Sequence, residues 1–400
     1  MPNYDPLQFV FPRGPAPLPT STPENFTTKQ HTAYAGAQAI ESLSQWSVVS
    51  AGSMKPQVAG RLLGYMLLEA PTVEGRDNVT FEIASCGGDE ARLKQLAQLY
   101  AAVYIRTFKV NDGKTPNHID EPLPDSYGGE KEDVPLRTRW ETRRNASKRD
   151  RHQCVLSRSY DLQYMCDLFR MEPGHPLFSS SVTCDPVEEA RIISIERKAN
   201  IADSQHQVKL KNPTRAAAIL SRFGKTDIFK ELDIDDLNHM SNIMTLNSSI
   251  HRFFDALHMC LVAVEGQPNT YRIEAFLPSV LNTIPENPVT FTTSDEENLP
   301  LPSPALLALH RACTRVAHFS GAGSYIDDLL EMDDPVVECD GSNWERPGEA
   351  LDLKLLGVAT RRTYCPPIRY AEVSMTELPR DLVLVNQFVV WLPFREVTSR

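Results

Sequence analysis

The stretch Asn242-Ile-Met-Thr-Leu-Asn-Ser-Ser-Ile-His251-Arg-Phe-Phe-Asp255-Ala-Leu-His258 decides how this sequence is interpreted. It begins with a β-prone run and continues into polar residues that commonly start helices, so it predicts a strand followed by a helix. At about 100° per residue, His251, Asp255 and His258 fall on one stripe of that helix. A histidine and a carboxylate at this spacing can hold a divalent ion. The same spacing is more common in hydrogen-bonded surface pairs, so the spacing alone leaves both interpretations open.

Further short runs with β character surround this stretch. Cys154-Val-Leu-Ser157 and Ala190-Arg-Ile-Ile-Ser194 precede it, while residues 258–264 and 271–276 follow it. The last two runs flank the turn-forming Gly266-Gln-Pro-Asn269, which predicts a hairpin. The expected order around the central stretch is therefore a strand, a second strand that carries an asparagine, and a helix that carries a histidine.

A spaced set of motifs resembles fungal proteins that carry an HNH nuclease domain. That family typically has Arg-Asp, Cys-Val-Val-Thr-Gly, Ala-His-Ile, Arg-Phe-Gly, Asn-x-Met-Thr-Leu and His-x-x-Phe-Asp in this order. The matching segments here are Arg149-Asp150, Cys154-Val-Leu-Ser157, Ala190-Arg191-Ile192, Arg222-Phe223-Gly224, Asn242-Ile-Met-Thr-Leu246 and His251-Arg-Phe-Phe-Asp255. The resemblance extends over residues 62–322, about two thirds of the chain. It implies an α+β fold with a ββα-metal (HNH-like) module.

The resemblance also implies a role for each matched residue. Asn242 corresponds to the residue that orients the general base through the backbone, and His251 to a metal ligand. Asp255 and His258 are the further candidate ligands. The implied cofactor is one divalent ion (Mg, Mn or Zn), which stabilises charge on the scissile phosphate while a base takes a proton from water.

The position that the family uses for the general base is occupied by Arg191. A guanidinium stays protonated at physiological pH, so it cannot accept the proton of the attacking water. General-base catalysis contributes about 10²- to 10⁴-fold, so we expect hydrolysis to be weak or lost. Either His239 or His258 could replace the base, and Arg191 could contact a phosphate or another anion instead.

The charge of the chain limits how it can meet nucleic acid. Its formal net charge is -11, so any contact with a polyanion has to be local. Residues 137–151 contain seven basic residues, and we take Arg143, Arg144, Lys148 and Arg149 as candidates for nucleic-acid or anion binding. A basic run of this kind is more often a solvated helix face.

The 400 residues exceed what one hydrophobic core usually holds, so we divide the chain into several parts. Residues 1–53 form a Pro-rich arm and lead-in, of which residues 1–24 carry seven prolines and are expected to lie outside the core. The other parts are a helical N-terminal lobe (54–110), a linker (111–136), the HNH-like module with a long insertion (137–285) and a mixed α/β C-terminal lobe (286–400). The C-terminal lobe begins with helical spacing over 300–330 and has strand-rich runs after residue 351.

Several further features bear on location and chemistry. The eight cysteines are widely scattered, which indicates reduced thiols. His310 and His318 are expected to be packed structural residues. Neither a signal sequence nor a long apolar window is found, so we expect an intracellular protein, cytoplasmic or nuclear, without a membrane partner.

These observations favour an HNH nuclease-like protein whose partner is nucleic acid. The alternative is the same scaffold repurposed as a small-molecule (biosynthetic) enzyme or as a binding protein, because a fold does not fix a function. The sequence leaves open whether the chain is an enzyme.

Overall fold

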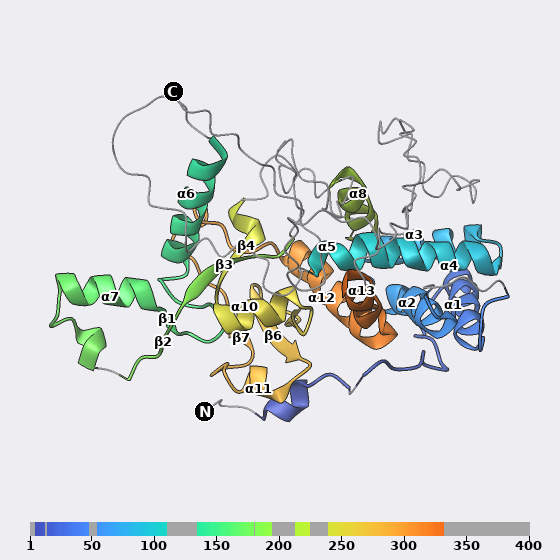
Figure 1. Cartoon of the computed structure of the whole chain (residues 1–400), viewed down its shortest axis with the longest axis horizontal. Coiled ribbons are helices and arrows are strands. Elements are labelled where there is room, and N and C mark those ends of the chain that lie inside the picture. Colours follow the sequence, from blue (N-terminus) through green and yellow to red (C-terminus); the bar gives the residue numbers. More distant parts are fainter. Residues whose placement is uncertain are drawn as a thin grey trace, which may run out of the picture. The chain divides into compact units, whose positions relative to one another are not determined.

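The computed structural model describes residues 5–12, 14–47, 54–109, 134–179, 181–193, 213–224 and 239–331. Chain packing divides the protein into two units, Met1–Asp352 and Leu353–Arg400, and all described residues belong to the first. The predicted linker at 111–136 falls largely outside the described residues, and so do the strand-rich runs after residue 351. The described part combines helices and sheets, which confirms the α+β class (Figure 1).

The N-terminal lobe is helical, as the sequence predicts. The predicted lobe 54–110 contains α2 (Pro56–Leu68), α3 (Val73–Ser85), α4 (Glu90–Leu99), a π-helix (Tyr100–Ile105) and α5 (Arg106–Phe108); α1 (Thr28–Glu41) precedes it, in the part that we predict as an arm and lead-in. The sequence of α1 explains where it starts, since Thr27 and Gln30 form a reciprocal capping box. Gly60 allows α2 to approach α1 closely, because a Cβ there would overlap the backbone of Glu41.

The strands form three small sheets. β1 (Tyr160–Asp161) pairs parallel with β2 (Cys184–Asp185), and β3 (Val187–Arg191) pairs antiparallel with β4 (Ile243–Asn247). β5 (Met259–Ala263), β6 (Thr270–Ala275) and β7 (Val289–Thr290) form the third sheet. The β5–β6 hairpin turns at Gly266 and Asn269, both with positive φ, and confirms the predicted hairpin.

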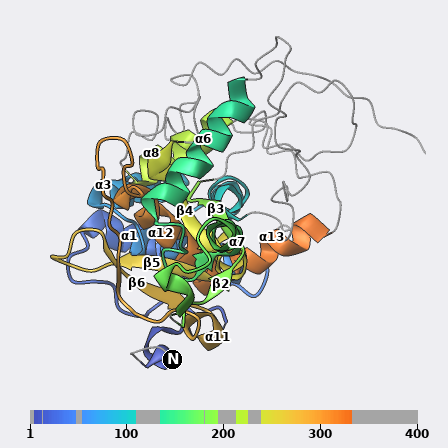
Figure 2. The same ribbon diagram turned by 90° about the vertical axis from the view of Figure 1, so that its left-hand side faces the viewer.

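The remaining helices connect and cover these sheets. They are α6 (Val134–Arg149), α7 (Leu162–Met171), α8 (Pro213–Gly224), α10 (Ser248–Asp255), α11 (Pro278–Leu281), α12 (Pro304–Ser320) and α13 (Ala322–Glu331); short 3-10 turns lie at Pro6–Phe9, Pro176–Ser179 and Met240–Asn242. α6 contacts both β3 and β4, and Figure 2 shows it beside them. The predicted helical stretch 300–330 is two helices, because Gly321 takes a left-handed φ of 79° at the end of α12.

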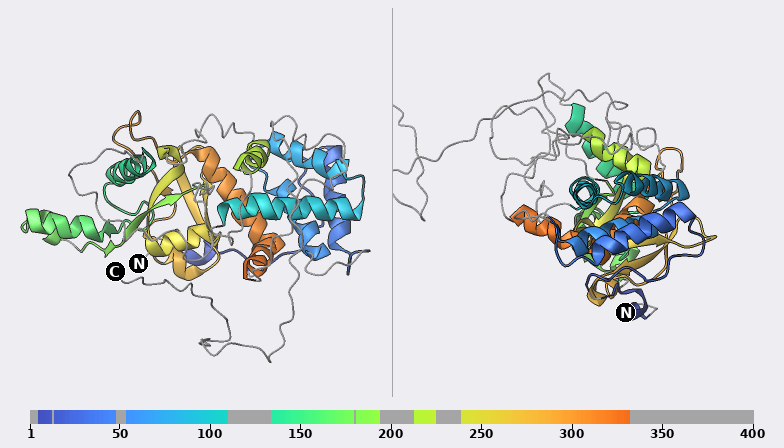
Figure 3. Two further views of the ribbon diagram at one scale, coloured as in Figure 1. Left: turned by 45° about the horizontal axis from the view of Figure 1, so that its top comes forward. Right: turned by 90° about the vertical axis from the view of Figure 1, so that its right-hand side faces the viewer.

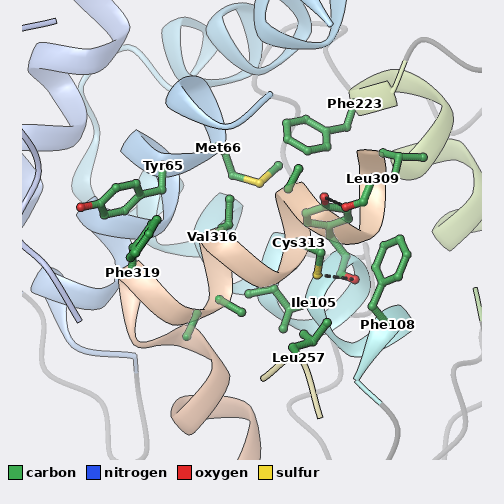
Figure 4. Packing of buried hydrophobic residues seen from close by; sticks show 14 of the residues in the cluster. Tyr65, Met66, Ile105, Phe108, Phe223, Leu257, Leu309, Cys313, Val316 and Phe319 are labelled. Atoms are coloured by element: carbon green, nitrogen blue, oxygen red, sulfur yellow. Dashed lines mark hydrogen bonds between the residues drawn. The ribbon is translucent and has the colours of Figure 1, made fainter. Parts of the chain in front are cut away.

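One hydrophobic cluster joins the helical lobe to the sheets, with α12 packed against both α2 and β5. Figure 4 shows α12 contributing Leu309, Cys313 and Val316 to this cluster. Tyr104 donates from its hydroxyl to the backbone oxygen of Leu309 at 2.9 Å, which fastens the π-helix to α12. The cluster therefore runs across the boundary that we predict after residue 285.

Two local predictions are wrong. The Pro-rich arm does enter the core, since Phe11 and Leu18 are each only 5% exposed, and Leu18 covers Gly64 of α2. Cys154-Val-Leu-Ser157 forms a turn instead of a strand, because Arg158 N bonds Cys154 O at 3.0 Å. Its apolar side chains are buried all the same, so the segment is apolar because it is buried and not because it pairs in a sheet.

Two broader observations concern the described residues. Their six cysteines are free thiols. Among the helices of this part, none is both long and apolar enough to span a membrane.

Candidate functional site

β3 and β4 form an antiparallel pair that leads directly into α10. The register places Ala190 opposite Met244 and Arg191 opposite Ile243. α10 starts immediately after β4, where Asn247 Oδ1 accepts a hydrogen bond from the backbone N of Ile250 at 2.8 Å. The helix packs on both strands, as the left view of Figure 3 shows. The predicted order of strand, strand and helix is therefore present.

Asn242 ties the two strands together where β4 begins. Its side chain is fully buried, its Oδ1 accepts from Ile193 N at 2.9 Å, and its Nδ2 donates to Ile193 O at 3.0 Å. Its backbone oxygen also accepts from Ile192 N at 2.8 Å. Asn242 thus fixes the backbone that follows Arg191, which is the kind of contact expected of an orienting asparagine.

His251 lies on the buried side of α10 between two carboxylates. Its Nδ1 is 2.8 Å from Glu188 Oε2, and its Nε2 is 3.3 Å from Asp255 Oδ2. Glu188 reaches the ring from β3, whereas Asp255 comes from the next turn of the same helix. The second oxygen of Glu188 accepts from the Ser248 hydroxyl at 2.8 Å, so this carboxylate is itself held in place.

The two carboxylates determine the charge of His251. Burial alone would lower its pKa, but the hydrogen bonds to Asp255 and Glu188 and their negative charges outweigh burial and raise the pKa to about 9. The hydrogen bond from His251 is in turn the main cause that holds the pKa of Glu188 below its usual value. At neutral pH the ring is therefore an imidazolium, and a metal ion would have to displace one of its protons.

The cluster offers a metal ion two protein ligands. Among the residues that the structure describes, no group of three or more His, Cys, Asp or Glu side chains is arranged to hold a metal. Glu188 and Asp255 meet opposite nitrogens of one ring, so only one of them can share an ion with His251. The 3.3 Å between His251 Nε2 and Asp255 Oδ2 suits a shared ion, because two donors on one tetrahedral ion lie about 3.4 Å apart.

Arg191 lies on the other face of β3 from His251. Side chains alternate along a strand, so Glu188 faces α10 while Glu189 and Arg191 share the opposite face. The guanidinium of Arg191 bonds Glu189 Oε1 at 3.2 Å, which agrees with this placement. The position expected for the base therefore does not point toward the candidate metal ligands.

His258 lies beyond the end of α10, which stops at Asp255. Leu257 takes a left-handed φ of 58°, so the chain turns away from the helix axis before His258. The exposed His258 ring lies 6.0 Å from the Phe276 ring. The prediction that His258 shares one helical stripe with His251 is therefore wrong, because the helix is too short.

Arg149 is buried and structural, which corrects its assignment to anion binding. It is 2% exposed and forms a two-bonded ion pair with Asp150, with Arg149 Nε to Asp150 Oδ1 at 2.7 Å. Its remaining donors bond three backbone oxygens, those of Met240, Ile243 and Pro300. A guanidinium with its donors used inside the fold is not available to a phosphate.

The other three candidates of the basic run are exposed. Arg143, Arg144 and Lys148 lie on the solvent side of α6. The opposite side of the helix, with Ala146 and Arg149, faces the interior. Three of the four candidate basic residues are therefore exposed to solvent.

The motif Arg222-Phe223-Gly224 docks α8 onto α3 and the π-helix. Asn78 donates to the backbone oxygen of Arg222 at 2.8 Å, and the guanidinium of Arg222 pairs with the buried Glu82 at 3.0 Å. The Phe223 ring lies 5.0 Å from the ring of Tyr104. These contacts give the motif a packing role.

Two residues of this region were missed by reasoning from the sequence. Glu188 is the group nearest to His251 Nδ1, and the signal that could have found it is the two-residue period of Val187-Glu-Glu-Ala-Arg191. Asp150 carries the buried pair with Arg149 and accepts from Thr245 N at 3.1 Å. The adjacent Arg-Asp in the sequence gives no indication that both side chains are buried.

Comparison with known protein families, curated proteins and solved structures finds no match for this chain.

Proposed function

We propose that β3, β4 and α10 form an HNH-type ββα-metal module that binds a divalent metal through His251 and Asp255. One observation carries this proposal: His251 Nε2 and Asp255 Oδ2 lie 3.3 Å apart on α10. This helix directly follows the strand pair β3–β4, whose ends Asn242 holds together. The remaining ligands of such an ion would be water and substrate oxygens, as is common for Mg²⁺. A metal bound there would stabilise negative charge on a phosphodiester.

We further propose that phosphodiester hydrolysis by this module is weak or lost. The position of the general base holds Arg191, whose guanidinium cannot accept a proton and pairs with Glu189. His251 is engaged by two carboxylates and serves the metal in this proposal, so it is not a substitute base. The module would then retain metal and nucleic-acid binding with little turnover.

The test combines metal binding with cleavage of plasmid and single-stranded DNA in Mg²⁺, Mn²⁺ or Zn²⁺. We expect wild type to bind Mn²⁺ or Zn²⁺ in titration calorimetry, and His251→Ala to lose this binding. His31→Ala on the distant α1 is the matched control and should bind as wild type does. Equal metal binding by wild type and His251→Ala would refute the metal site.

Cleavage then separates the remaining possibilities. If wild type cuts and His251→Ala does not, the module is an active nuclease whose base is a residue other than Arg191, and His239→Ala tests the exposed His239. If wild type binds metal and does not cut, hydrolysis has been lost as proposed. Cleavage by wild type that His251→Ala leaves unchanged would refute the assignment of the site.

A specific observation favours a second candidate, the scaffold repurposed as a small-molecule enzyme or a binding protein. Arg149 is used inside the fold, so of the four candidate basic residues Arg143, Arg144 and Lys148 remain exposed, in a chain of net charge -11. Weak electrostatic attraction to a polyanion follows from this balance. Substituting Arg143, Arg144 and Lys148 by Glu decides between the candidates, because a nucleic-acid binder would lose affinity and reduce its salt dependence.

A further inference from the structure

Glu188 contacts His251 and Ser248 with different oxygens of one carboxylate. Oε2 lies 2.8 Å from His251 Nδ1, and Oε1 accepts from the Ser248 hydroxyl at 2.8 Å. Glu188 sits on β3, opposite Leu246 of β4, so the strand pair fixes the point from which the side chain reaches α10. The side chain is 40% exposed, yet two hydrogen bonds define its orientation.

We infer that Glu188 is the positioning residue of this site: it holds the Nδ1–H of His251 and thereby leaves Nε2, beside Asp255, as the atom that faces a metal. The inference rests on the proposed function for the identity of the ligand. Glu188 lies outside the sequence motif around Asn242 and His251, which gives no role to this residue.

The physical reason lies in the two nitrogens of an imidazole. A histidine that binds a metal through one nitrogen usually donates its other ring N–H to a carboxylate or carbonyl, which fixes the tautomer and the ring orientation. Glu188 occupies the Nδ1 side and Asp255 the Nε2 side of the same ring. Only the Nε2 side has a carboxylate from the same helix within reach of a shared ion.

The geometry also explains why Glu188 is not a third metal ligand. Its carboxylate lies against the nitrogen on the opposite edge of the ring from Asp255, and its other oxygen is engaged by Ser248. An ion at Nε2 is therefore separated from Glu188 by the ring itself. The carboxylate acts on the metal only through His251.

The first measurement uses the metal-free full-length protein with ¹⁵N-labelled histidine. We expect a slowly exchanging ring N–H signal of His251 at Nδ1 in wild type, and loss of that signal in Glu188→Ala. Glu188→Gln should retain it, because the amide oxygen can accept from Nδ1–H while the amide nitrogen donates to Ser248. Glu265→Ala, in the exposed turn between β5 and β6, is the matched control and should leave the signal unchanged.

The second measurement is the Kd for Zn²⁺ or Mn²⁺ of the same four proteins. Loss of a carboxylate that orients a metal-binding histidine costs about 10- to 100-fold in metal affinity, so we expect Glu188→Ala to weaken binding by this factor and Glu188→Gln by much less. A Kd or an N–H signal that is the same in Glu188→Ala and wild type overturns the role of Glu188. If wild type binds neither metal, the proposed metal site fails, and the N–H signal alone then decides whether Glu188 positions His251.

Discussion

Lowering the pH from 7 to 5 should destabilise this protein through His310. The ring is fully buried in α12, stacks on Phe254 of α10 at 3.7 Å between centroids, and lies with Nε2 3.3 Å from the Phe254 oxygen. Its Nδ1 is buried and has no hydrogen-bond partner among the residues that the structure describes, so a proton added there would find no acceptor among them. Burial is the main cause that lowers the pKa of His310 to about 3.

The sign and size of the effect follow from linkage. The folded pKa is below that of an unfolded histidine, about 6.5, so the unfolded state binds more protons at acid pH and stability falls as pH drops from about 6.5 toward 3. At pH 5 the difference between the two states amounts to about 2 kcal/mol for this one residue. That is a large share of the free energy of unfolding of a typical domain, which is roughly 5–15 kcal/mol.

The assay is urea unfolding of wild type and His310→Leu at pH 7 and pH 5. All other titrating groups are present in both proteins, so the difference between their pH dependences isolates His310. We expect wild type to lose about 2 kcal/mol more free energy of unfolding than the variant between these two pH values. Equal losses would show that His310 titrates normally in the folded protein, and would refute the account of its burial.

Three further substitutions test contacts that hold the fold together. Arg149→Met leaves the carboxylate of Asp150 buried without its partner and should cost about 3–5 kcal/mol in urea unfolding. Asn242→Ala removes both bonds to the Ile193 backbone, so we expect a loss of about 1–3 kcal/mol and faster amide exchange at Ile193. In Gly75→Ala the added methyl overlaps the backbone oxygen of Phe223 in α8, so amide exchange over residues 213–224 should accelerate while α1 stays protected.

The long periodic elements could be predicted from the sequence. The apolar spacing of residues 54–106 and 300–330 indicates helices, and the turn residues between 264 and 271 indicate the β5–β6 hairpin. Each of these signals is local, because it depends on how one segment alternates between core and solvent. The structure agrees with them for that reason.

The first strand of the module was predicted about three residues too late. The apolar Ile192 and Ile193 suggest a strand at 190–194, whereas β3 covers Val187–Arg191. The two isoleucines are buried after the strand ends, held by Asn242, and the charged pair Glu188 and Glu189 conceals the strand that precedes them. A contact between residues 49 positions apart has no signature in either segment alone.

The end of α10 shows a different limit. The stripe of His251, Asp255 and His258 assumes a regular helix through residue 258, but Leu257 adopts a left-handed φ of 58°. A leucine seldom takes this conformation, so sequence rules place no helix end there. What stabilises it is tertiary, since Leu257 is 5% exposed and belongs to the main hydrophobic cluster.

The orientation of β3 bears on the proposed loss of the general base. Motif order places Arg191 where a catalytic histidine is expected, but its side chain shares a face with Glu189 and not with His251. In this backbone an Arg191→His variant would bring its imidazole to Glu189, on the side of β3 away from Asp255, so we expect the substitution alone not to restore hydrolysis. If Arg191→His does restore cleavage, the side chain of residue 191 must face His251 in the active protein. The alternation of side chains along β3 would then differ from the one that places Glu188 beside His251.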